Sequence, residues 1–150
     1  MEYCSVVWFL YYFCYKIRLE NIQRRFLKFL YFRIFDVYPG RGFGHSVLLE
    51  TLNVDSLEFR RIHYSLKFLY SIFRNKIDCS HLLSLFNILI PRLNSRQTLT
   101  FYLRKPNTNI LVKSPVFSMA SHFNSISHLC DINTSSLREM ICALRSIYVM

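Results

Sequence analysis

The sequence predicts a mostly α-helical protein, a small helical domain of about five to six helices with a long irregular connection around residues 91–115. Three observations indicate this fold class. More than half of the 150 residues are apolar, which is enough to bury a core and argues against disorder. Glycine is scarce, while the aromatic share is about double the usual one. Apolar side chains also recur with the 3.6-residue period of helices.

The first expected helix extends from about Lys16 to Phe35 and includes the segment ENIQRRFLKFLYF, at residues 20–32. At about 100° per residue, its apolar side chains gather on one stripe, which should face the core, while positive charge faces away. If the rings of this stripe are fully buried, truncating one to alanine would cost roughly 3–5 kcal/mol. The stripe consists of Leu19, Ile22, Phe26, Phe29 and Leu30, and the opposite side carries Arg24, Lys28 and Tyr31.

An apolar run, YCSVVWFLYYFCY, occupies residues 3–15. It has no basic leader and no small-residue cleavage site, unlike a signal peptide. On a helix it would span roughly 20 Å, less than the ~30 Å hydrocarbon core of a bilayer. A buried core helix is therefore the preferred interpretation, and a membrane anchor is the alternative.

The middle of the chain begins with a glycine cluster, YPGRGFGH at residues 38–45. It matches neither the Gly-x-Gly-x-x-Gly pattern nor a Walker motif, so it is interpreted as a plain linker. A short helix is expected over residues 47–52. Asp55 and Glu58 have capping-box spacing and predict a longer helix that ends near Arg74, before a polar turn at 75–78. Two stripes are expected along this helix, and it should be buried along much of its length. Leu57, Arg61, Tyr64 and Phe68 share one side, and Ile62, Leu66, Leu69 and Phe73 form the other stripe.

The C-terminal part alternates helices with turn-rich segments. Ser80 is expected to cap a helix over residues 81–89 that ends before Pro91. Residues 91–115 are rich in Pro, Asn, Ser and Thr and should form a surface connection, with TLTFYL at 98–103 as a short strand or extended arm. Two helices follow, at 115–123 and 136–148, the second with Ser136 and Glu139 in a capping box. The chain thus divides into residues 1–90, 91–115 and 116–150.

The formal net charge is +10, from 19 Lys and Arg against 9 Asp and Glu. This excess points to a polyanionic partner, either nucleic acid or an anionic membrane, unless it only keeps an aromatic-rich chain in solution. The alternative to phosphate binding is a structural role for these side chains. Arg24 would then pair with Glu20, and Arg60 and Arg61 would brace a neighbouring helix or lie on a solvated face. The candidate phosphate contacts, with no base reading implied, are Arg24, Arg25, Lys28, Arg60 and Arg61.

Residues for catalysis or metal binding are not grouped in the sequence. The aspartates at 36, 55, 78 and 131 are isolated, so no active site, cofactor or small-molecule substrate is expected. The five cysteines are expected to be reduced core thiols, which favours an intracellular compartment. The residues that could be imagined as zinc ligands lack the spacing of zinc sites: Cys79 with His81, or His122, His128, Cys130 and Cys142.

Several segments carry a resemblance to a known family. They are EYCSVVW at 2–8, the tyrosines at 11–12, ENIQRRFLKFLYF at 20–32, LETLNVDSLEFRR at 49–61, IDCSHLLSLFNILIPR at 77–92, Thr108-Asn109, Ser114-Pro115, and Met119 with Phe123-Asn124. Together they resemble the end of the reverse transcriptase protein of jockey-type non-LTR retrotransposons, in order and spacing, over nearly the whole chain. Phe9, Leu10 and the glycine cluster depart from the family pattern, which suggests drift in a decaying copy.

In that family, this region begins late in the thumb and follows the Tyr-Ala-Asp-Asp motif of the polymerase site. The resemblance implies a truncated C-terminal remnant that is not an enzyme by itself, with residues 1–90 as thumb-like and post-thumb helices. It implies nucleic acid as the partner, bound weakly and without sequence preference, in the nucleus or cytoplasm. The alternative function is a small basic membrane-associated protein anchored by residues 3–15.

Overall fold

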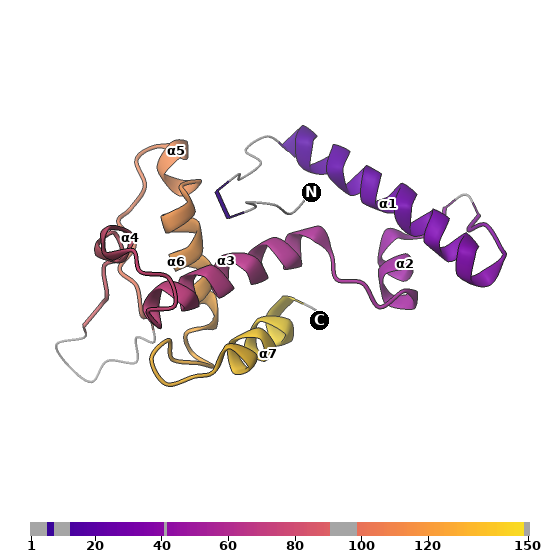
Figure 1. Ribbon diagram of the computed structural model, residues 1–150. Helices are drawn as coiled ribbons and strands as arrows, with labels where there is room; N and C mark the ends of the chain where they lie inside the picture. The colour runs from indigo at the N-terminus through magenta and orange to yellow at the C-terminus, as the bar shows by residue number, and fades with distance from the viewer. Residues whose placement is uncertain (1–5, 8–12, 41, 91–98, 149–150) are drawn as a thin grey trace. The chain divides into compact units, whose positions relative to one another are not determined.

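The chain folds mostly into α-helices, which confirms the predicted fold class. The computed structural model describes residues 6–7, 13–40, 42–90 and 99–148, and these residues contain seven helices and one isolated β-bridge. Most of the apolar run 3–15, and residues 91–98 of the expected connection, lie outside the described residues. The helices are α1 (Phe13–Phe35), α2 (His45–Thr51), α3 (Leu57–Phe73), α4 (Ser80–Ser84), α5 (Asn109–Val112), α6 (Pro115–Ile126) and α7 (Leu137–Tyr148) (Figure 1).

The helices belong to two compact units that divide between Arg60 and Arg61, inside α3. The N-terminal unit contains α1, α2 and the start of α3, and the C-terminal unit contains the rest of α3 and α4 to α7. The sequence suggested a division at residue 90 instead. In the structure, residues 61–90 cluster with those after 99, because Phe73 and Phe86 both pack against Phe101.

The buried side of α1 is not the expected apolar stripe. Leu27 and Gln23 are buried, with 1% and 7% of their surface exposed. In contrast, Phe26 and Phe29 are 60% and 57% exposed, and Ile22 is exposed as well. The prediction that this stripe completes a core is therefore wrong, and the loss of roughly 3–5 kcal/mol expected for a buried ring does not apply to these two rings.

The phase of α1 could not be read from its sequence because large apolar side chains occur on all of its sides. In the N-terminal unit α1 contacts α2, whose Leu48 is fully buried. The observed phase leaves Gln23 with a buried amide, and neither its Oε1 nor its Nε2 has a hydrogen-bond partner among the described residues. An unpaired buried amide is unfavourable, so the apolar burial around it must offset this cost.

Of the two stripes expected along α3, the one formed by Ile62, Leu66, Leu69 and Phe73 is the more buried. At the start of α3, the N–H of Phe59 donates a capping hydrogen bond to the Oγ of Ser56 at 3.2 Å. Of the stripe, Ile62, Leu66 and Leu69 are buried and Phe73 is half-buried.

Asn75 ends α3 and confirms the polar turn predicted there. It adopts a left-handed backbone conformation with φ of 53°, which asparagine tolerates better than most residues. The N–H groups of Asn75 and Lys76 donate to the carbonyl oxygens of Ile72 and Ser71 at 3.1 and 2.9 Å. This is the Schellman pattern that satisfies the last carbonyls of a helix.

The core of the C-terminal unit centres on Phe101, which is 1% exposed. Its ring centroid lies 5.5 Å from those of Phe73 and Phe123 and 5.7 Å from that of Phe86. Asn124 on α6 holds the backbone of the same residue: the N–H of Phe101 donates to Oδ1 at 3.0 Å, and Nδ2 donates to its carbonyl oxygen at 2.9 Å. Ring packing and paired hydrogen bonds thus fix this segment against α6.

The helix predicted over residues 81–89 is shorter than expected. It corresponds to α4, which ends at Ser84. Ser80 is the first residue of α4 rather than its cap, and Cys79 occupies the N-cap position without a side-chain hydrogen bond. The helix stops early because the next residues pair with another segment instead.

That pairing also corrects the expectation of a surface connection over residues 91–115. The N–H of Leu89 donates to the carbonyl of Thr100, and the N–H of Tyr102 donates to that of Asn87, both at 2.8 Å, around an isolated antiparallel bridge. The piece TLTFYL therefore forms a bridge, in its described part, rather than a strand of its own. Because Phe101 is buried, this part of the connection belongs to the core, and α5 interrupts the remainder.

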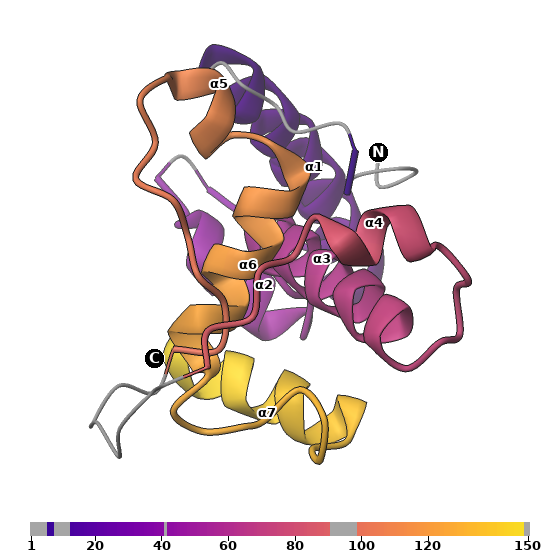
Figure 2. The ribbon, with the colours of Figure 1, turned by 90° about the vertical axis from the view of Figure 1, so that its left-hand side faces the viewer.

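The last two helices confirm their predicted starts. α6 has Pro115 in its first turn, and the Oγ of Ser114 accepts a hydrogen bond from the N–H of Phe117 at 3.3 Å. In α7, the N–H of Glu139 donates to the Oγ of Ser136 at 3.3 Å, and the N–H of Ser136 donates back to Glu139 Oε2 at 2.8 Å. Figures 1 and 2 show α5 at one end of α6 and α7 at the other, in agreement with their contacts.

Candidate functional site

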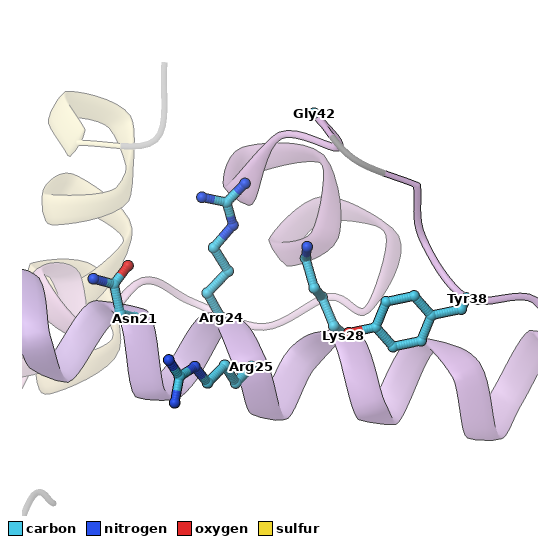
Figure 3. A pocket seen from close by; sticks show the side chains of 6 residues that line it. All are labelled: Asn21, Arg24, Arg25, Lys28, Tyr38 and Gly42. Atoms are coloured by element: carbon cyan, nitrogen blue, oxygen red, sulfur yellow. The ribbon is translucent and has the colours of Figure 1, made fainter.

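An open pocket of about 510 Å³ lies in the N-terminal unit, between α1 and the loop that follows it (Figure 3). α1 contributes four side chains. The last three of them follow the first by three, four and seven residues, which places all four on one side of the helix. The loop contributes two residues. The lining residues are Asn21, Arg24, Arg25, Lys28, Tyr38 and Gly42. Three of them are positively charged and none is acidic.

Specific contacts return the loop to α1. The guanidinium of Arg24 donates from Nη2 to the carbonyl oxygen of Phe43 at 3.0 Å. The ring centroid of Phe43 lies 5.7 Å from that of Tyr31, and the ring centroid of Tyr38 lies 6.4 Å from that of Phe32. The glycine cluster, predicted to be a plain linker, is therefore part of the wall of this pocket.

Two left-handed residues give this loop its path. Asp36, with φ of 51°, follows α1, and its N–H donates to the carbonyl oxygen of Phe32 at 2.8 Å. Gly42, with φ of 95°, adopts a conformation that a side chain would strain, although there is open space around its Cα. A glycine is thus required at this point of the wall for backbone reasons.

The three cations of the pocket do not all point the same way. Arg24 and Lys28 project from α1 toward the loop, whereas Arg25 points along the helix rather than toward the loop (Figure 3). The first two are half-buried and Arg25 is exposed. Arg24 bonds to Phe43 of the loop, rather than forming the ion pair with Glu20 that was the alternative.

This arrangement is suited to binding an anion with several oxygen atoms. Guanidinium and ammonium groups form strong, charge-assisted hydrogen bonds to phosphate or carboxylate oxygens. The amide of Asn21 and the hydroxyl of Tyr38 can donate further hydrogen bonds into the same pocket.

His45 is the first residue of α2, and the charge of Arg24 affects its pKa. Its pKa is lowered from the ordinary value of 6.5, first by burial and then by the positive charge of Arg24, against the opposing effect of Glu20. The folded protein therefore favours the neutral imidazole beside the Arg24 guanidinium.

Lowering the pH from about 7.5 to about 5.5 is expected to destabilise the protein partly through His45. Because its folded-state pKa lies below 6.5, the unfolded chain binds more protons in this range. The contribution of the neutral side chain, present above pH 6.5, is lost as the pH falls through the folded-state pKa. Urea unfolding of wild type and His45→Gln at both pH values should show a smaller loss in the variant. An equal loss in both proteins would contradict this assignment.

The other two candidate cations do not line this pocket. Arg60 and Arg61 lie near the start of α3, on either side of the division between the units, and both are half-buried. Sequence reasoning also missed three lining residues. Helical spacing could have indicated Asn21, but Tyr38 and Gly42 enter only because the loop turns back, and no sequence pattern indicates that turn.

Metal ligands are not assembled in the described part of the chain, where no three His, Cys, Asp or Glu side chains are grouped so as to hold a metal ion. The four cysteines described by the structure are free. Burial raises the pKa of Cys130, with further contributions from Asp131 and Glu139. Cys14 and Cys142 are exposed, which corrects the expectation that the cysteines are all core thiols.

No helix among the residues that the structure describes is long and apolar enough to cross a membrane. In comparisons with known proteins, no family model, no curated protein and no solved structure matches this chain. Its function is therefore inferred from the pocket and from the sequence.

Proposed function

We propose that this chain is a C-terminal remnant of a retrotransposon reverse transcriptase, not an enzyme by itself, that binds the phosphate backbone of nucleic acid weakly and without sequence preference. The observation that carries the proposal is the pocket on α1, which Arg24, Arg25 and Lys28 line with no acidic lining residue. The resemblance to jockey-type elements supports the same ligand, because the basic face of this helix would there point toward the template and primer backbone.

A polyanion fits the pocket better than a single small anion does. Arg24 and Lys28 are one helical turn apart, about 6 Å along the axis, and Arg25 extends away from both (Figure 3). A chain of phosphates presents negative charge over such a distance and in more than one direction. The net charge of +10 adds a longer-range attraction to any polyanion.

The proposal includes no catalytic role, in keeping with the isolated aspartates of the sequence. Backbone contacts alone do not distinguish bases, so binding should not depend on sequence. We also propose a nuclear or cytoplasmic setting, where nucleic acid is accessible.

The proposal is tested by fluorescence anisotropy with labelled RNA strands of about 20 nucleotides and with a primed duplex, at salt concentrations from about 50 to 200 mM. Two strands of equal composition and scrambled sequence should bind with equal affinity, and both affinities should fall as salt rises. Absence of binding at the lowest salt, a strong preference for one of the scrambled strands, or binding that salt leaves unchanged would overturn the proposal.

A further inference from the structure

α1 exposes a second surface beside the pocket, which we call the aromatic stripe and which consists of Ile22, Phe26 and Phe29. Their exposed fractions are 46%, 60% and 57%. At about 100° per residue, these side chains lie within about 60° of one another and form one continuous strip. Single exposed apolar residues are common on proteins, but clustered exposed rings mark binding surfaces.

Positive side chains border one edge of the aromatic stripe. Arg18 and Arg25 lie along this edge and are exposed, and the pocket follows farther round the helix. The opposite edge carries Leu19 and Leu30, which are half-buried, and leads to the buried side of α1. Arg33, also exposed, continues the line of the stripe toward the end of the helix. A line of positive side chains, Arg18 and Arg25, therefore runs along α1 beside the aromatic stripe, and we call this line together with the adjoining pocket the charged lane.

We propose that α1 binds a single nucleic-acid strand in preference to a duplex. The phosphates of the strand lie in the charged lane, and its bases stack on Phe26 and Phe29. This inference rests on the function proposed above and names the form of the ligand. In a single strand the flat faces of the bases are available next to the phosphates, whereas in a duplex they are hidden in the stack. Lanes of cations and exposed rings are the combination used by proteins that bind single strands without sequence preference.

An anionic bilayer could also attract arginines and exposed rings, as interfacial helices do. A bilayer surface, however, has no need of a pocket for individual phosphate groups. Here two half-buried cations, an amide and a hydroxyl converge on such a pocket next to the stripe. The charge complementarity of α1 therefore favours a nucleic-acid strand over a lipid surface.

The test compares Phe26→Ala/Phe29→Ala with wild type on an RNA strand of about 20 nucleotides and on a duplex containing the same strand. Stacking on an aromatic ring contributes roughly 5- to 150-fold in affinity per base, so the double variant should bind the strand at least about tenfold more weakly. Its affinity for the duplex and its salt dependence should not change, because the rings carry no charge. Thermal unfolding should also be nearly unchanged, because both rings are exposed.

Two further variants separate stacking from other uses of the stripe. Phe26→Leu/Phe29→Leu keeps the apolar surface but removes the flat rings, so it should lose strand affinity as the alanine variant does, while Phe26→Trp/Phe29→Trp should keep it. Tyr102→Ala/Tyr148→Ala, which removes two exposed rings of the C-terminal unit, is the matched control and should bind as wild type does.

The possible outcomes are distinguishable. If wild type binds neither strand nor duplex, the proposed function itself fails. If it binds both and the alanine variant matches wild type on the strand, only the present inference is overturned. Three other results would also overturn the inference. The leucine variant could bind the strand as wild type does, or sedimentation could show that the stripe joins two copies. The alanine variant could lose binding to phosphatidylserine vesicles while its strand binding stays intact.

Discussion

Replacing Phe101 with alanine is expected to destabilise the C-terminal unit by roughly 3–5 kcal/mol, the largest effect of any single change considered. The ring is 1% exposed and lies within 5.7 Å of three other phenylalanine rings, so its removal leaves a cavity at the centre of the core. The backbone of Phe101 is held by Asn124 at both its N–H and its carbonyl group, so it has little freedom to collapse into the space. Urea unfolding followed by circular dichroism measures the loss.

The matched control for this change is Phe29→Ala, which removes the same side chain from an exposed position. With 57% of its surface exposed, Phe29 should change the free energy of unfolding by less than about 1 kcal/mol. The sequence alone led to the opposite expectation, in which Phe29 is a core residue and residue 101 belongs to a surface connection. A larger loss for Phe29→Ala than for Phe101→Ala would contradict the packing described here.

Removing the three cations of the pocket together is expected to produce the second large effect. If Arg24, Arg25 and Lys28 each neutralise a phosphate of a single strand, their replacement by alanine should flatten the dependence of log affinity on log salt by about two units. Extrapolated from the point near 1 M salt where such lines meet, this corresponds to roughly 10²- to 10³-fold weaker binding at about 50 mM salt.

Arg24 needs separate treatment because it also ties the loop to α1 through the carbonyl of Phe43. Arg24→Ala can therefore lower the stability of the pocket as well as its charge. The pair Arg25→Ala/Lys28→Ala avoids this problem, because neither side chain makes a hydrogen bond to the described residues. This double variant should keep wild-type stability. Its slope of log affinity against log salt should still show more than half of the flattening expected for the triple variant.

The sequence predicted those parts of the fold that local chemistry decides. The starts of α6 and α7 were correct because a serine cap, an N1 proline and a capping box are signals contained in a few neighbouring residues. For α3 the sequence indicated two stripes, and the structure buries chiefly the one that contains Ile62, Leu66 and Leu69. In α1 large apolar side chains occur on every side, so the phase depends on tertiary contact with α2, which periodicity does not contain.

The site shows the same limit. Clustering of Arg24, Arg25 and Lys28 follows from their spacing on a helix and was predicted, whereas the pocket also needs the loop that brings Tyr38 back to α1. The early end of α4 likewise depends on pairing with residues beyond the following segment, which no local signal near Ser84 indicates. Contacts between segments distant in the sequence account for each of these differences.

The most direct test of a phosphate-binding pocket on α1 is the salt dependence of RNA binding by two variants that lose equal charge. One is Arg24→Ala/Arg25→Ala/Lys28→Ala, and the other is Arg104→Ala/Lys105→Ala/Arg138→Ala, which removes three exposed cations of the C-terminal unit. We expect the first variant to have a slope of log affinity against log salt that is flatter by about two units, and the second to keep the wild-type slope. Equal slopes for both variants would show that only net charge matters, and would contradict the assignment of the pocket.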